Sequence, residues 1–213
     1  MRRRRTQDAL VAAAHRAGVS DERVLAAVAA VNREHFVPRG AESEAALDRP
    51  IVIGSGQTTS QPSLIASMVA ALELTGTERV LEIGTGFGYQ TALLAHLVVE
   101  VYSIERIASL AERARENLAA CGIEGVEVVV GDGTRGLPEA APFDAVVISA
   151  AARGVPADVA GQVTEGGRLV APVGPQGAQT VVRYTVRDGR LQDPQRLSSV
   201  RFVPLIGDEP GSG

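Results

Sequence analysis

Apolar and polar positions alternate along the second half of the chain in a way that predicts a parallel sheet. Short apolar runs rich in β-branched residues are separated by segments with helical spacing. This alternation is typical of parallel strands with helices on both faces of the sheet. The predicted strands span 79–84, 99–105, 126–133, 143–152 and 166–174. We therefore expect an α/β fold with a doubly wound, Rossmann-like sheet.

The C-terminal part of the chain has a different pattern. Residues 180–192 and 196–205 look like strands with no helix between them, and a turn at Asp188-Gly189 interrupts the first. Strands joined without a helix pair antiparallel. We expect them to close the sheet with an antiparallel strand.

The N-terminal part predicts helices followed by a long loop. Residues 6–36 carry two helical patterns, and Ser20 is placed to cap the second of them. Residues 41–61 lack long periodicity, and Pro62 opens a third helix that runs to about Leu74. No linker or repeat divides the chain, so we expect a single domain over residues 1–213. Its N-terminal helices and loop occupy 1–61 and its core sheet 62–213.

Composition and charge exclude several functional classes. The chain has 213 residues, 45% of them apolar, and it lacks the run of about 18 apolar residues that a membrane span needs. The net charge is −4, aromatic residues make up 3%, and every basic residue is arginine. An acidic protein of this kind is a poor nucleic-acid binder, and we interpret the arginines at positions 2–5 as a solvated tail. The single cysteine, Cys121, favours a reducing compartment, so we expect a cytoplasmic protein without a membrane partner.

Three glycines after the first parallel strand indicate a nucleoside site. Gly84, Gly86 and Gly88 have the spacing GxGxG, whereas the dinucleotide fingerprint is GxGxxG. This spacing disfavours a nicotinamide dehydrogenase. Glu105 follows 21 positions after Gly84, at the next strand end, where a carboxylate can accept hydrogen bonds from both ribose hydroxyls. A tight turn and a helix N-terminal acid would use the same residues.

Two further acids narrow the ligand. Asp132 lies at the third strand end, where it could accept a hydrogen bond from an adenine amino group or simply form a turn. Glu82 lies inside an apolar strand and needs a partner, which a cationic ligand would supply. No lysine or phosphate-binding loop is present. A ligand with a ribose, an adenine and a cation but no phosphate is S-adenosylmethionine.

The same segments resemble a known enzyme family. The blocks "VLEIGTGFGYQTALLAHL", "VYSIERI", "VVVGDGTRGLPEAAPFDAVVISAAA" and "GGRLVAPVG", with the upstream "DRPIVIGSGQTTSQP", are similar to protein-L-isoaspartate O-methyltransferases over about residues 20–206. The block "IGSGQTTSQP" distinguishes this family from other methyltransferases. The resemblance implies one S-adenosylmethionine-dependent methyltransferase domain with a seven-stranded sheet, mostly parallel with an antiparallel strand at its C-terminal end.

The resemblance also implies roles for individual residues. Ser60 matches the active-site serine, and its loop helps to hold cofactor and substrate. Ser60 also lies just before Pro62, where serine commonly caps a helix. For substrate contacts we add Ala150, Ala151, Arg153 and Ser149 to Ser60. The expected cofactor residues are Gln57, Thr58, Thr59, Glu82, Gly84, Thr85, Gly86, Gly88, Glu105, Arg106, Asp132 and Gly133. We assign no metal site.

The chain departs from the family pattern at two places. Arg153 and Gly154 replace the proline that usually follows the alanines, and Ser55 stands where bulky residues are common. Both positions are expected to border the acceptor site and to affect acceptor preference.

The chemistry favours an acid as acceptor. A carboxylate with a pKa of about 3.9 is already ionised at neutral pH and needs no base. The chain offers few bases: its three histidines have helical or helix-end positions.

We therefore expect methyl esterification of the free carboxylate of L-isoaspartyl residues in damaged proteins and peptides, by a monomer. By resemblance, the ester then collapses to a succinimide that partly hydrolyses to aspartate. The alternatives are a tailoring methyltransferase for one dedicated peptide and a catalytically silent nucleoside-binding module.

Overall fold

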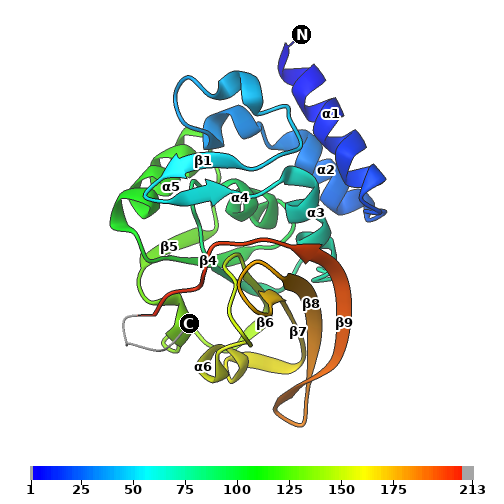
Figure 1. The fold of residues 1–213 in the computed structure, drawn as a ribbon, viewed down its shortest axis with the longest axis vertical. Coiled ribbons are helices and arrows are strands. Elements are labelled where there is room, and N and C mark those ends of the chain that lie inside the picture. Colours follow the sequence, from blue (N-terminus) through cyan, green and yellow to red (C-terminus); the bar gives the residue numbers. More distant parts are fainter. Residues whose placement is uncertain (1, 208–213) are drawn as a thin grey trace.

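The computed structural model describes the backbone of residues 2–207 and the side chains from residue 6 onward. Among them is one seven-stranded sheet with the order β5-β4-β3-β6-β7-β8-β9. The strands from β5 to β7 are parallel, and β8 is antiparallel to both of its neighbours. The expected α/β fold with one antiparallel strand near the C-terminal end is confirmed (Figure 1). The strands are β3 (Arg79–Ile83), β4 (Glu100–Glu105), β5 (Val126–Val130), β6 (Phe143–Ile148), β7 (Val163–Val173), β8 (Gln179–Arg187) and β9 (Arg190–Val200).

Side chains of the central strands point alternately to the two faces of the sheet and pack into a hydrophobic core on each face. Val80, Val101 and Val147 point to the face covered by the N-terminal helices, α4 and part of α5. Their neighbours Leu81 and Val146 point to the other face, where α6 and the C-terminal segment cover them. Because both faces are buried, the strands read as continuous apolar runs. The helices are α1 (Arg2–Arg16), α2 (Glu22–Ala30), α3 (Pro62–Ala70), α4 (Tyr89–Ala95), α5 (Ala108–Ala120) and α6 (Ala157–Ala160).

The hairpin between β8 and β9 turns at the predicted residues. Asp188 and Gly189 both have positive φ, 52° and 67°, which is the backbone of a two-residue hairpin turn. The first predicted segment, 180–192, covers β8 and the start of β9, whereas the second, 196–205, covers only the end of β9, which stops at Val200. In Figure 1, β9 forms the outer edge of the sheet and curves toward α3.

Details of the N-terminal part differ from the sequence prediction. The cap of α2 is Asp21, not Ser20, because the Asp21 carboxylate accepts hydrogen bonds from the amides of Arg23 and Val24. The helix opened by Pro62 ends at Ala70, four residues earlier than expected. Residues 31–61 contain two 3-10 turns, η1 (Arg33–Phe36) and η2 (Glu42–Glu44), and the hairpin of β1 (Ile51–Gly54) and β2 (Gln57–Thr59).

None of the helices in the described part of the chain is long and apolar enough to cross a lipid bilayer.

Candidate active site

Two adjoining cavities lie at the carboxyl ends of the central strands. The first is a narrow space of about 100 Å³ beside the glycine loop that follows β3. The second is an open cavity of about 740 Å³ beside Ser60. Thr58, Ser149 and Val203 line both and form the wall between them. We call them the glycine-loop cavity and the Ser60 cavity.

The loop that follows β3 lines the glycine-loop cavity with glycines whose φ angles are positive. Gly84 and Gly86 have φ of 97° and 57°, which side chains rarely adopt. A Cβ on Gly84 would lie 3.4 Å from the Ser149 side chain, and one on Gly86 would lie 3.3 Å from Ile53 of the β1–β2 hairpin. These glycines keep the backbone close to whatever occupies the cavity.

Glu105 ends β4 and lines the same cavity. Its carboxylate accepts hydrogen bonds from the amide nitrogens of Gly86 at 2.9 Å and Ile107 at 3.0 Å. These bonds hold the acid across the mouth of the glycine loop. The geometry suits an acceptor for a ribose hydroxyl, since a carboxylate has about four lone-pair positions and the amides use two.

Glu82 has partners that the sequence did not reveal. Its side chain is fully buried and accepts hydrogen bonds from Gln90, Thr91 and Ser103. Burial raises the pKa of the Glu82 carboxyl to about 7, although the three hydrogen bonds lower it. The negative charge of Glu105 raises it further. The expectation that a cationic ligand supplies its partner is wrong, because neutral side chains of the protein already do so. Gln90 also donates to the Ser149 hydroxyl at 2.9 Å, so this network reaches the wall between the cavities.

The structure divides the predicted cofactor residues into two groups. Gly133 lines the glycine-loop cavity, whereas Asp132 caps the 3-10 turn η3 (Gly133–Arg135) by accepting hydrogen bonds from Thr134. Asp132 borders a separate surface cleft instead. The predicted residues that line the glycine-loop cavity are Gln57, Thr58, Gly84, Gly86, Glu105, Arg106 and Gly133. Those outside its lining are Thr59, Glu82, Thr85, Gly88 and Asp132.

Ser60 lines the second cavity and does not cap α3. The N-cap of α3 is Gln61, whose side chain makes no capping bond, so capping by Ser60 is contradicted. Asp48 takes that role from a distance, because its carboxylate accepts hydrogen bonds from the Ser63 amide at 2.9 Å and the Ser63 hydroxyl at 2.8 Å. Within the described residues the Ser60 hydroxyl makes no hydrogen bond. It is therefore available to a substrate.

A buried arginine holds the backbone that carries Ser60. The Arg33 side chain is 0% exposed and donates to the carbonyl oxygens of Ala45, Leu47, Arg49 and Ser60 at 2.9 to 3.3 Å. Burial lowers its pKa to about 10, although Tyr89 and Asp48 oppose that fall. No pattern in the sequence indicates this role for Arg33, which follows the apolar helix α2.

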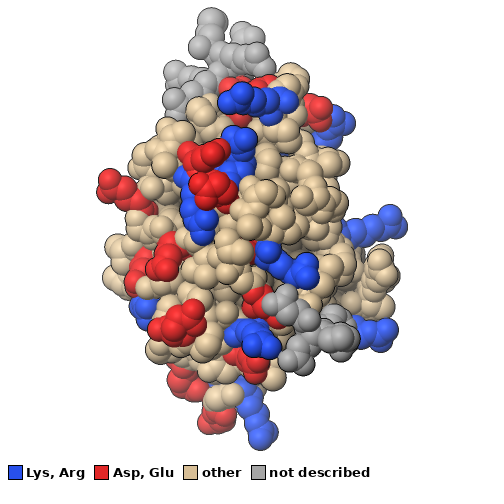
Figure 2. Space-filling model, turned by 90° about the vertical axis from the view of Figure 1, so that its left-hand side faces the viewer, with Lys and Arg blue, Asp and Glu red and all other residues tan. Residues whose placement is uncertain are grey.

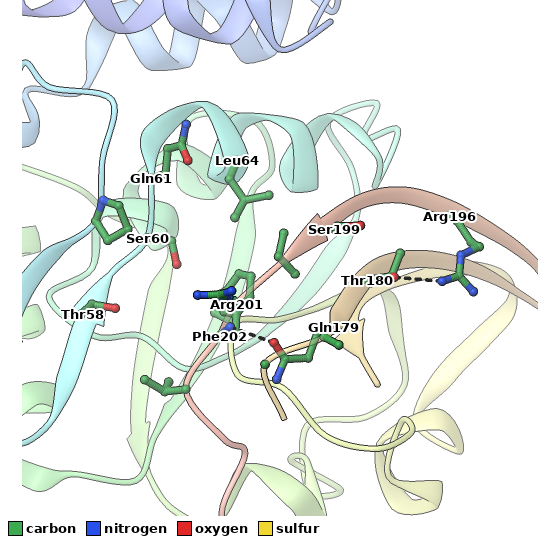
Figure 3. A pocket seen from close by; sticks show the side chains of 16 residues that line it. Thr58, Ser60, Gln61, Leu64, Gln179, Thr180, Arg196, Ser199, Arg201 and Phe202 are labelled. Atoms are coloured by element: carbon green, nitrogen blue, oxygen red, sulfur yellow. Dashed lines mark hydrogen bonds between the residues drawn. The ribbon is translucent and has the colours of Figure 1, made fainter. Parts of the chain in front are cut away.

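The predicted substrate residues are partly gathered here. Ser149 lines both cavities, and Ala150 lines the glycine-loop cavity. Ala151 is buried and bridges Pro204. Arg153 and Ser55 are exposed and lie outside the lining of both cavities, contrary to the expectation that they border the acceptor site. The Ser60 cavity is instead lined by Arg201, on the side of Ser60, and by Arg196, beside Thr180 on the far side (Figure 3). The sequence did not indicate either arginine.

Comparisons with known proteins agree over nearly the whole chain. A model of the protein-L-isoaspartate(D-aspartate) O-methyltransferase family matches residues 5–210. A protein-L-isoaspartate O-methyltransferase of Methanoculleus marisnigri is 53% identical over 190 residues, which cover 89% of this chain and 86% of the relative. One of Myxococcus xanthus is 49% identical over 201 residues, which cover 93% and 95%.

Solved structures give the same result for the fold. A protein-L-isoaspartate O-methyltransferase structure matches with a TM-score of 0.85 and 29% identity over 95% of this chain and 66% of that one. A Plasmodium falciparum structure in complex with S-adenosyl-L-homocysteine matches with a TM-score of 0.82 and 22% identity, over 94% and 97%. The family match and the identity to these relatives lead to one conclusion. The chain belongs to the protein-L-isoaspartate(D-aspartate) O-methyltransferase family.

Proposed function

We propose that this chain methylates the free carboxylate of L-isoaspartyl residues in damaged proteins and peptides, with S-adenosylmethionine as the donor. The observation that carries this proposal is the common wall of Thr58, Ser149 and Val203 between the two cavities. A donor in one cavity and an acceptor in the other would meet there. Family membership and about half-identical relatives of that name support the same reaction.

The glycine-loop cavity is suited to the nucleoside part of the cofactor. Glu105 would accept hydrogen bonds from the ribose, and the positive-φ glycines would let the backbone lie against the ligand. The cavity is small beside the roughly 300 to 1,000 Å³ of most ligand sites.

The Ser60 cavity is suited to the acceptor. When bound, the cofactor supplies an electrophilic methyl group on a sulfonium. The chain's own task is to align a carboxylate with it, because an ionised acid needs no general base and in-line geometry dominates the rate. Ser60 would donate a hydrogen bond to the acceptor carboxylate, and Ser149 stands on the common wall. None of the described residues lining either cavity is a histidine.

The remaining parts of the proposal concern context. We propose that the enzyme works as a cytoplasmic monomer that does not bind nucleic acid. On the face in Figure 2, acidic and basic side chains are interspersed, and we see there no continuous basic strip of the kind that nucleic acid requires. Within the described residues no group of three or more His, Cys, Asp or Glu side chains could hold a metal ion.

The decisive experiment offers labelled S-adenosylmethionine with paired peptides that contain either aspartate or isoaspartate at one position. We expect methylation of varied isoaspartyl peptides, negligible methylation of their aspartyl twins, and an ester that releases methanol in mild base. Equal labelling of both twins would contradict the proposal. Labelling confined to one peptide sequence would indicate a tailoring enzyme, and cofactor binding without labelling of any peptide would indicate a silent nucleoside-binding module.

A further inference from the structure

One wall of the Ser60 cavity carries positive charge in an otherwise acidic protein. Among the described residues that line the cavity, the charged side chains are Arg196 and Arg201, and no aspartate or glutamate is present. The chain as a whole has a net charge of −4. This local reversal of sign indicates that the cavity receives anionic groups.

Arg201 is held in place by its backbone, whereas its side chain has no partner. The amide of Phe202 donates to the Gln179 side chain at 3.3 Å, and Val203 and Leu205 are hydrogen-bonded to the backbone of Ala151. These bonds fix the segment after β9 against the end of β6. No hydrogen bond or ion pair holds the Arg201 guanidinium among the described residues. Figure 3 shows it pointing into the cavity toward Ser60.

Arg196 lies within β9, five residues before Arg201, and lines the same cavity. Its guanidinium donates to the Thr180 hydroxyl at 3.0 Å. It lines the Ser60 cavity and also a second groove, between β9 and α3, which continues outward from it. The two arginines are five positions apart, a distance of about 16 Å on an extended strand. An extended peptide of about five residues would pass both.

The reacting carboxylate is not the group that these arginines address. That carboxylate must lie at the common wall of Thr58, Ser149 and Val203, and neither arginine belongs to this wall. A guanidinium paired with the nucleophile would also withdraw the electron density that attacks the methyl group. The charges therefore face other parts of the acceptor peptide.

We propose that Arg201, with Arg196 beyond it, binds carboxylates of acidic residues that flank the isoaspartyl residue, so that acidic peptides are the preferred acceptors. This inference rests on the proposed function. A guanidinium binds a carboxylate through two parallel hydrogen bonds, which fixes orientation as well as position. Arg201 contributes binding of the flanking residue and does not take part in methyl transfer.

The test uses three isoaspartyl peptides that differ only at one residue beside the isoaspartate, which is Glu, Gln or Lys. For the wild type we expect KM to be about fivefold lower for the Glu peptide than for the Gln peptide, equivalent to about 1 kcal/mol. The Lys peptide should have the highest KM, and kcat should be the same for all three. The preference for Glu should largely disappear at about 1 M salt, where the Debye length falls to about 3 Å.

Variants assign the preference to a residue. Arg201→Gln should raise KM for the Glu peptide to about the value for the Gln peptide, so that the preference for Glu disappears. Arg190→Gln is the matched control, because Arg190 is an exposed arginine at the far end of the same strand and outside the described cavities. It should leave the preference intact.

The outcomes separate this inference from the proposed function. Methylation of all three peptides with equal KM, or a Glu preference that survives both Arg201→Gln and high salt, would overturn the subsite and leave the methyltransferase activity standing. No methylation of any isoaspartyl peptide would overturn the proposed function itself and the subsite with it. The wild-type peptide series and its salt dependence need no variant, so the inference stays testable if Arg201→Gln fails to fold.

Discussion

The two cavities are built from different parts of the chain, although they share a wall. The glycine-loop cavity uses residues that directly follow the parallel strands, such as Gly84 after β3 and Glu105 at the end of β4. The Ser60 cavity combines a loop before α3 with the start of β8 and the segment after β9. Its walls come from residues as far apart in the chain as Pro50 and Val203. The glycine-loop cavity, one half of the candidate active site, is therefore built from residues close together in the chain. The Ser60 cavity, the other half, depends on packing between distant segments.

The difference teaches where each half is vulnerable. The glycine-loop half is fixed by the sheet itself, through backbone pairing of β3 with β4 and β6. The Ser60 half depends on side chains that bind loop backbone, above all Arg33 and Asp48. Substitutions should therefore affect one half without the other.

The largest expected effect on stability is that of Arg33→Met, which removes the side chain that holds the backbone of the Ser60 half. It removes the donor shared by four carbonyl oxygens, and unsatisfied buried acceptors cost about 1 to 3 kcal/mol each. Because the loop can partly relax toward water, we expect the free energy of unfolding in urea to fall by about 3 kcal/mol. In the folded variant, KM for the peptide should rise while the cofactor Kd changes less than about twofold.

The control for Arg33→Met is Arg113→Met. Arg113 is exposed and pairs with Glu116 at 2.9 Å, so its loss should change stability by less than about 0.5 kcal/mol. If Arg33→Met weakened cofactor and peptide binding equally, the division into two halves would be wrong.

The next prediction concerns Glu82, whose hydrogen-bond network lies beside the glycine-loop cavity, and the pH dependence of stability that follows from its burial. The pKa of Glu82 is raised to about 7 by burial, so the folded protein holds a proton that the unfolded chain loses near its ordinary pKa of 4.5. Stability from this group is fully present below about pH 4.5 and is lost as pH rises through about 7. Over this window wild-type stability should fall relative to Glu82→Gln by up to about 3 kcal/mol.

Urea unfolding of both proteins between pH 4.5 and 7.5 measures this difference. Glutamine keeps an acceptor for Gln90, Thr91 or Ser103 but cannot ionise, so it is the matched variant. A difference that stays constant across the range would mean that Glu82 is charged in the folded protein throughout.

The sheet and the residues at the ends of its strands are the parts of the molecule that could be predicted from the sequence. Alternating apolar runs predicted the parallel strands, and the dipeptide Asp188-Gly189 predicted the hairpin, because these signals act within a few residues. The glycines were recognisable since Gly84 and Gly86 need positive φ. Spacing along the chain translates directly into position at the edge of a parallel sheet.

The remaining features depend on partners far away in the chain. Asp48 caps α3 from 15 positions upstream, and Arg33 reaches the Ser60 carbonyl 27 positions away. Such contacts leave no periodic signal, so the sequence allows Ser60 to be a helix cap as well as an active-site residue, and the structure excludes the cap. For the same reason the sequence indicates Arg153, which adjoins a predicted strand end, and gives no sign of Arg201, which lines the Ser60 cavity.

A smaller effect is expected from Glu105→Ala, which attacks the glycine-loop half alone. Loss of hydrogen bonds to a charged group should weaken S-adenosylmethionine and S-adenosylhomocysteine binding by about 1.5 to 3 kcal/mol, measured by calorimetry. Stability should fall as well, because the Gly86 and Ile107 amides lose their acceptor.

Glu100→Ala is the control for Glu105→Ala at the opposite end of β4. Glu100 forms a partly exposed pair with Arg79 at 2.6 Å, and its loss should leave cofactor affinity unchanged. Unchanged affinity in a folded Glu105→Ala variant would rule out the ribose assignment.

The smallest expected change in stability, from Ser60→Ala, gives the sharpest distinction within the Ser60 half. Since the Ser60 hydroxyl makes no hydrogen bond within the described residues, Ser60→Ala should alter the free energy of unfolding by less than about 0.5 kcal/mol. It should lower kcat/KM for isoaspartyl peptides at least about tenfold, because a hydrogen bond to a carboxylate is lost.

Asp48→Ala should show the reverse. It removes the cap of α3 and should cost about 0.5 to 2 kcal/mol of stability, with a smaller loss of activity than Ser60→Ala. Ser60→Asn completes the set, because asparagine keeps a polar side chain at position 60 but places its amide where the serine hydroxyl stood. If Ser60 acts on the acceptor, Ser60→Asn stays as inactive as Ser60→Ala at unchanged stability. Full activity in Ser60→Asn would instead remove Ser60 from the reaction and leave Thr58 and Ser149, on the common wall, as the hydroxyl side chains that line both cavities.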